Sequence, residues 1–376
     1  MKRIRIGRKG RIIFSILFLL VLTAWTFGTP YRKVEPLPGN ILDMHCHVAG
    51  VGAGESSCFI SKSLRESWRF RIYLRSFGTS KEELEKHGDR IVPKLLSESL
   101  AKSRFVSQAV ILAMDGVVGK DGSLDTNRTE VYVPNQFVLA AVQEHTNLLF
   151  GASINPYRTN ALELLDWAKT NGAVLVKWIP SIMHIDPADE ELIPFYEKMV
   201  ELDLPLLTHT GNERSFSTSA DDFGDPVRLR LPLSLGVKVI AAHIASTGSF
   251  HGERSTDRLA KLMSEFSNLT SEISSLTQIN KRPYMKEALT RNEFQGRLIY
   301  GSDFPLINTA LVSSWYYSFR LSPRQIWRIS REKNPWDADV LLKQQLGTPA
   351  EIFAKSRQLL TPERTAARID PVEATH

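Results

Sequence analysis

The sequence has only two cysteines, Cys46 and Cys58, among 376 residues. This scarcity excludes a fold that depends on a framework of disulfides. A bridge between the two would require an oxidising compartment. We expect none, because Cys46 lies between two histidines on a predicted strand and so faces the helices that cover it.

Outside the first eleven residues, positive and negative charges balance. The formal net charge is +6, and Lys2, Arg3, Arg5, Arg8, Lys9 and Arg11 account for all of it. The remainder of the chain is therefore close to neutral and shows no basic patch. We expect no nucleic-acid partner.

Long apolar runs are also few, and the one at 12–28 directly follows these basic residues. A basic segment followed by such a run is typical of a membrane anchor or a secretory signal. We predict a signal anchor or transmembrane segment at 1–29 and a proline-containing linker at 30–39. The membrane would then be a partner and the remaining chain would lie outside the cytoplasm, in the periplasm of a bacterium. The chain would be secreted if the segment were cleaved.

What the chain does contain is eight apolar, strand-like runs in succession, most of them dense in Val, Ile and Leu, as in parallel strands that are buried on both faces. The runs are Asn40–His47, Ser107–Asp115, Leu148–Asn155, Ala173–Ile179, Leu204–Thr210, Lys238–Ile244, Leu269–Ser275 and Arg297–Asp303.

Helical patterns separate most of these runs, and strands that alternate with helices indicate a parallel α/β sheet. Eight such units favour a (β/α)8 TIM barrel, which we place at 40–360. No GxGxxG follows the first run, so a dinucleotide-binding fold is disfavoured. The long segment 48–93 after the first strand is predicted to cap the barrel. Extra C-terminal helices are expected within 323–360, followed by a flexible tail at 361–376.

Potential metal ligands stand at the ends of four runs. They are His45 and His47, then His209, His243 and Asp303. Because strand ends of a barrel surround one opening, these side chains are expected to meet there. Imidazoles and a carboxylate form a suitable shell for a divalent metal that also keeps a position for water.

Strand alternation gives a more detailed expectation for the first run. It predicts that Asp43, His45 and His47 share the inward face, while Met44 and Cys46 face the helices. The pattern leaves open whether Glu272, on the seventh run, points inward or outward.

These segments resemble the amidohydrolase superfamily, and within it the amidohydrolase-related (amidohydrolase 2) branch, which includes decarboxylases and lactonases. The resemblance covers about 40–360. It rests on HCH at 45–47, THTGNE around His209, AAH ending at His243 and YGSDFP around Asp303.

The resemblance implies a metal held by His45, His47, His209 and Asp303, with Asp303 also acting as general acid and base. His243 would polarise the substrate carbonyl or stabilise the developing oxyanion. We expect one Zn²⁺ per chain, although Mn²⁺ and Fe²⁺ suit the same ligands.

Lys177, at the end of the fourth run, leaves two arrangements open. In some members of the superfamily a lysine at this place is carbamylated and bridges two metals, with His209 and His243 then binding the second one. Otherwise Lys177 would pair with an anion of the substrate or with a carboxylate. Asp115, Arg158 and Glu213 are further candidates for contact with the substrate.

The leading functional prediction is a metal-dependent hydrolase that acts on a C–O or C–N bond of a small carbonyl or cyclic substrate. The alternative is non-oxidative decarboxylation of a small carboxylic acid. A first-strand His45, where several decarboxylases have Glu, slightly favours hydrolysis. A third hypothesis, from another class, is a membrane-tethered binding protein with a non-catalytic barrel.

Overall fold

A computed structural model of the chain describes residues 7–28, 34–213 and 220–360. The predicted tail at 361–376 and part of the predicted linker lie outside these ranges. Eight parallel strands form one sheet in their sequence order. They are β1 (Ile41–His47), β3 (Val106–Leu112), β5 (Leu148–Ala152), β6 (Leu175–Trp178), β7 (Leu206–Thr208), β8 (Val239–Ala241), β11 (Leu269–Glu272) and β12 (Leu298–Ile299).

The sheet curls so that its first and last strands meet. The amide of His47 donates to the Phe304 carbonyl at 2.8 Å, and the amide of Asp303 donates to the His45 carbonyl at 2.8 Å. The predicted TIM barrel is thus confirmed, with all eight strands inside or within one residue of the predicted runs.

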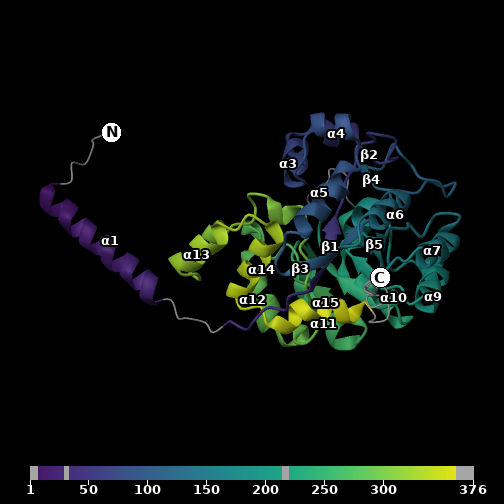
Figure 1. The fold of residues 1–376 in the computed structure, drawn as a ribbon. Helices are drawn as coiled ribbons and strands as arrows, with labels where there is room; N and C mark the ends of the chain where they lie inside the picture. Colours follow the sequence, from purple (N-terminus) through teal and green to yellow (C-terminus); the bar gives the residue numbers. More distant parts are fainter. Residues whose placement is uncertain (1–6, 29–33, 214–219, 361–376) are drawn as a thin grey trace, which may run out of the picture.

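Helices surround the strands, as Figure 1 shows. The main ones are α5 (Ile91–Leu100), α6 (Asn135–Glu144), α7 (Ala161–Thr170), α9 (Ile193–Glu201), α10 (Arg230–Ser234), α11 (Ser255–Glu265), α12 (Arg282–Thr290) and α15 (Ala350–Leu359). Shorter elements are α8 (Pro180–Met183), β9 (Ser249–Phe250) and β10 (Glu253–Arg254). The larger apolar cluster lies between helices and strands, and a smaller one fills the barrel, with Leu42, Leu175 and Ile240 among its members.

The insertion after β1 forms the predicted cap. It contains β2 (Phe59–Ile60), α2 (Lys62–Glu66), α3 (Trp68–Ser76) and α4 (Lys81–His87). Strand β2 pairs with β4 (Val131–Tyr132), which follows β3, so the cap is tied to a second loop on the same rim. Figure 1 shows α3 and α4 standing above the strands.

Strand β1 departs from the simple alternation expected for it. Asp43 pairs with Ala109 and Cys46 pairs with Ile111, so three steps along β1 match two along β3, which is a β-bulge. Met44 consequently packs inside the barrel, whereas Asp43 points outward. The prediction that Asp43 faces inward and Met44 outward was wrong, because the extra residue resets the alternation.

Beyond the bulge, the predicted directions of His45, Cys46 and His47 are confirmed. His45 and His47 reach the cavity at the barrel mouth, and Cys46 joins the outer apolar cluster. Cys46 and Cys58 are both free thiols.

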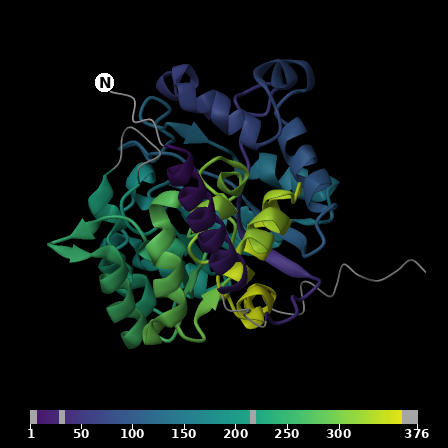
Figure 2. The ribbon, with the colours of Figure 1, turned by 90° about the vertical axis from the view of Figure 1, so that its left-hand side faces the viewer.

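Two further helices, α13 (Pro323–Ser330) and α14 (Pro335–Gln345), precede α15, which confirms extra helices in the C-terminal part. The N-terminal segment forms α1 (Arg8–Gly28), which lies outside the barrel and beside α13 (Figures 1 and 2). The Trp25 indole N–H donates to the Ser318 carbonyl at 2.6 Å.

Among the residues that the structure describes, no helix is long and apolar enough to cross a membrane. The predicted membrane-spanning anchor is therefore not supported. The expected location outside the cytoplasm stays a prediction.

Candidate active site

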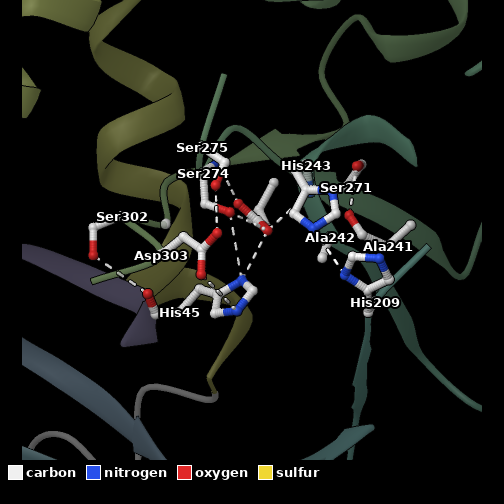
Figure 3. A network of polar contacts seen from close by, with 12 residues as sticks. His45, His209, Ala241, Ala242, His243, Ser271, Ser274, Ser275, Ser302 and Asp303 are labelled. Carbon is white, nitrogen blue, oxygen red and sulfur yellow. Dashed lines mark hydrogen bonds and ion pairs between the residues drawn. The ribbon is translucent and has the colours of Figure 1, made fainter. Parts of the chain in front are cut away.

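The four segments singled out in the sequence meet at one end of the barrel. His45 and His47 end β1, while His209, His243 and Asp303 follow β7, β8 and β12. All five side chains line one cavity of about 240 Å³. Figure 3 shows four of them: His45 and Asp303 lie together, with His243 and His209 to one side.

The tightest group consists of His45, His47 and Asp303. One potential ligand atom from each lies within 4.8 Å of the others. The two Nε2 atoms are 3.1 Å apart, and Asp303 Oδ1 is 3.6 Å from His45 Nε2 and 3.5 Å from His47 Nε2. Three atoms that bear lone pairs thus converge on one point, where a cation would relieve their repulsion.

The direction of His45 is set by Glu272, which is fully buried. His45 Nδ1 lies 3.0 Å from Glu272 Oε1, so an N–H there donates to the carboxylate and leaves Nε2 facing the group. Burial, with the nearby Lys177 ammonium, lowers the pKa of His45 to about 4. Burial would raise the pKa of Glu272, but hydrogen bonds from His45 and Ser274 outweigh it and hold that pKa below its usual value.

Asp303 is fixed in a similar way. The Ser275 hydroxyl donates to its Oδ2, and the Gln278 amide donates to Ser275 Oγ at 2.9 Å. Burial alone would raise the pKa of Asp303, yet His45 and His47 hold it well below the usual range. The Asp303 backbone has φ 61°, a left-handed conformation that is uncommon for a residue with a side chain.

His209 and His243 form a second pair beside the first group. His243 Nε2 lies 3.2 Å from His209 Nδ1, so one nitrogen donates to the other. The backbone N–H of His243 donates to Glu272 Oε1 at 2.9 Å, which links this pair to His45. Burial lowers the pKa of both histidines, most strongly that of His243. The compact group does not include His209, whose predicted place as a fourth ligand stays a prediction.

Lys177 and Glu213 also line the cavity. Lys177 is 2% exposed, and its Nζ lies 3.2 Å from His45 Nε2. Burial lowers the pKa of this ammonium to about 8. Glu213 Oε2 is 3.5 Å from His209 Nδ1. Both residues thus lie at the candidate site, and their contact with substrate stays a prediction.

Asp115 and Arg158 lie elsewhere. Arg158 forms a two-pronged ion pair with Asp115, with Nε 2.7 Å and Nη2 2.5 Å from its carboxylate oxygens. Neither residue lines the cavity. They neutralise one another, and their contact with substrate stays a prediction.

Sequence reasoning missed three residues that shape the site. The sequence left open whether Glu272 points inward. Its position on the strand between those that precede His243 and Asp303 did indicate that it lies near the site. Ser275 and Lys281 were not considered. Lys281 lines the cavity, is 8% exposed and contributes to the lowered pKa of His243.

The donor set fits a divalent metal. Beyond the converging atoms of the compact group, the described part of the chain offers no hydrogen-bond partner to buried His209 Nε2 or His243 Nδ1. A buried imidazole nitrogen without a partner is costly, and metal coordination is one way to satisfy it. Neutral imidazoles and a carboxylate suit zinc, manganese and iron alike.

A family model for amidohydrolases matches residues 43–332 of this chain. The chain belongs to the amidohydrolase 2 family. This membership confirms the resemblance noted from the sequence motifs. No curated protein matches the amidohydrolase chain in sequence.

Solved structures share the fold of this amidohydrolase at low sequence identity. An uncharacterized TIM-barrel protein from Bordetella bronchiseptica is 15% identical, with a TM-score of 0.51 over 81% of this chain and 99% of that one. A proposed 2-pyrone-4,6-dicarboxylic acid hydrolase from Pseudomonas putida is 14% identical, with a TM-score of 0.50 over 86% and 98%. An amidohydrolase 2 protein from Bifidobacterium longum subsp. infantis is 14% identical, with a TM-score of 0.46 over 85% and 98%.

Proposed function

We propose that this amidohydrolase is a metal-dependent hydrolase that cleaves a C–O or C–N bond of a small carbonyl or cyclic substrate. The observation that carries the proposal is the convergence of His45, His47 and Asp303 within 4.8 Å at the mouth of the barrel. Glu272 holds His45 and Ser275 holds Asp303, so both side chains are fixed in their direction.

The proposed cofactor is one Zn²⁺ per chain, held by His45, His47 and Asp303, with His209 as the fourth ligand. When bound, such an ion acidifies a coordinated water and polarises a carbonyl. Glu272 would keep the Nδ1 proton of His45 in place, so that Nε2 remains available as a ligand.

The reaction would use the chain's own groups as follows. Asp303 would take the proton of the attacking water on a carboxylate oxygen and return it to the leaving group, which is general base and then general acid catalysis. His243 would donate an N–H to the substrate carbonyl oxygen as negative charge develops there. Lys177 and Lys281, which both line the cavity, would stabilise that charge at longer range.

Lys177 leaves open the alternative of a site with two metal ions. Its Nζ lies on the same cavity wall as both histidine pairs, 3.2 Å from His45 Nε2. If it were carbamylated, His209 and His243 would bind a second ion. Elemental analysis of protein purified without chelator distinguishes the two, since one metal per chain supports the proposal and two support the bridged site.

The competing activity is decarboxylation, for which two lysines near the metal ligands could hold a carboxylate. A panel of lactones, esters, amides and aromatic or unsaturated carboxylic acids separates the reactions. Formation of a carboxylic acid with an alcohol or amine group, without carbon dioxide, supports hydrolysis, whereas release of carbon dioxide from an acid overturns it. The proposed hydrolase relative from Pseudomonas putida makes the pyrone dicarboxylate a useful member of the panel.

A further inference from the structure

Two chemically different sets of residues line the cavity. Its charged and imidazole side chains come from β1 and β6 and from the segments that follow β7, β8, β11 and β12. The cap supplies a second set of lining residues, and none of those from 48–93 carries a charge. Six of these residues form what we term the cap roof: Val51, Ile60, Leu64, Phe70, Leu74 and Phe77.

The cap roof is built into the fold. Asp89, which is fully buried, accepts hydrogen bonds at 2.8 Å from the amides of both Val51 and Gly52. The Asn308 side chain donates to the Ser76 carbonyl at 2.8 Å, and this bond ties α3 to the loop after β12. A pocket that is shaped before its ligand arrives loses less entropy on binding.

The cap roof begins beside the metal-binding group. The Phe77 ring packs edge-on against Phe304, with centroids 5.8 Å apart, and Phe304 directly follows Asp303. A substrate whose carbonyl sits at the group would therefore extend its next substituent along the roof.

The basic residues of the cap add no charge to the lining of the cavity. Arg65 directs its guanidinium to the carbonyl of Val51 at 2.9 Å, and the Arg69 guanidinium lies 5.9 Å from the centroid of the Trp68 ring. No lysine or arginine of 48–93 lines the cavity. A carboxylate at the far end of the substrate would thus lose its hydration against the roof without gaining an ion pair there.

We infer that the substrate carries an uncharged apolar group, an alkyl chain or an aryl ring, on its scissile carbonyl, and that the cap roof binds this group. The inference rests on the proposed function, since the carbonyl is placed by the metal-binding group. It defines the substrate class as neutral acyl compounds rather than dicarboxylates.

Hydroxamates test the inference because they bind divalent metals without being turned over as esters. Calorimetry would compare acetohydroxamate, octanohydroxamate and the octanoyl analogue that ends in a carboxylate, with metal-loaded and metal-free protein. Each methylene buried against the roof should tighten binding about fourfold. Octanohydroxamate should bind at least ~100-fold more tightly than acetohydroxamate, and the terminal carboxylate should remove most of this gain.

Variants on one helix provide the matched control. Phe70→Glu places a carboxylate in the cap roof, whereas Ile72→Glu changes a 43% exposed residue of the same helix that does not line the cavity. Phe70→Glu should abolish the gain, so that octanohydroxamate binds no more tightly than acetohydroxamate. Ile72→Glu should preserve both affinities. Leu64→Glu, on α2, repeats the test should Phe70→Glu fail to fold.

The possible outcomes separate the two proposals. Equal affinity for the acetyl and octanoyl ligands, or no loss from the terminal carboxylate, would overturn the inference and leave the hydrolase proposal intact. Acetohydroxamate binding that is unaffected by metal removal would instead overturn the metal site. In that case, the difference in affinity between octanohydroxamate and acetohydroxamate, measured with metal-free protein, would still show whether the cap roof binds the octanoyl chain.

Discussion

At the residue scale, the directions of His45 and Asp303 are each set by a neighbour that does not itself line the cavity. Glu272 receives the Nδ1 proton of His45, and Ser275 donates to the outer oxygen of Asp303. Because each of these contacts uses the atom that faces away from the group, the remaining nitrogen and oxygen are directed inward. The site thus depends on polar residues behind the ligands as much as on the ligands.

Replacing Glu272 with glutamine tests this dependence. Glu272→Gln retains a carbonyl oxygen that can accept from His45 but removes the charge that stabilises its Nδ1–H. Outer partners of metal-binding histidines typically contribute on the order of 10–100-fold to metal affinity, so we expect a loss in that range. Competition with a chromogenic chelator measures it. Glu253→Gln, in the short strand β10, is the control, and an unchanged affinity in Glu272→Gln would show that Glu272 has no such role.

Asp303 should matter more for turnover than for metal retention. Asp303→Asn keeps an oxygen ligand but can no longer take a proton, and loss of a positioned acid–base group costs on the order of 10²–10⁴-fold in kcat. The measurement is kcat on the first substrate found in the panel, beside the metal content of the same preparation. Full activity in Asp303→Asn with metal bound would contradict the assigned role.

At the scale of elements, α14 forms hydrogen bonds with both segments that carry the metal-binding group of His45, His47 and Asp303. The Trp336 indole N–H donates to Asp43 Oδ2 at 2.8 Å, next to the β1 bulge. The Lys343 ammonium donates to the Gly301 carbonyl at 3.0 Å, just before Asp303, and to Asp339 Oδ2 at 2.7 Å. One helix therefore holds the ends of both β1 and β12.

Removal of one member of this buried ion pair should be costly. Lys343 and Asp339 are both fully buried, so Lys343→Met would leave the Asp339 charge without its partner. Such a change destabilises by about 3–5 kcal/mol, which urea denaturation would show as a lower midpoint. Lys198→Met removes a lysine of α9 that pairs with Asp166 of α7 and Glu201, two exposed carboxylates, and it should leave the midpoint unchanged. Equal midpoints for the two variants would argue against α14 as a fastening element.

The strands were predictable because a strand buried on both faces reads as a continuous apolar run. The direction of single side chains was less predictable. Asp43 and Met44 depend on a bulge that is defined by pairing with β3, which a lone strand does not reveal. Glu272 faces the site through the stagger of β11 against β8 and β12, and that stagger is a property of the closed barrel.

At the scale of the whole molecule, the active site joins segments that are more than 250 residues apart, since His45 and Asp303 come from the first and last strands. An ion bound between them would link the two edges of the sheet where the barrel closes. Ligands that bind the native state alone raise its stability by mass action, by about 4 kcal/mol at a thousandfold excess over the dissociation constant. Metal loading should therefore stabilise the entire barrel rather than the loops alone.

The thermal unfolding midpoint of the chain should accordingly rise by several degrees when zinc is added to chelator-treated protein, and saturate near one equivalent. His47→Ala should abolish the rise with little effect on the metal-free midpoint, because His47 already lines the cavity at the barrel mouth and its loss only widens that cavity. His87→Ala, an exposed histidine at the end of α4, is the matched control and should keep the full rise. Differential scanning calorimetry provides the measurement. The same zinc-dependent rise in His47→Ala and in the native chain would mean that zinc binds elsewhere, and the site at the barrel mouth would lose its principal support.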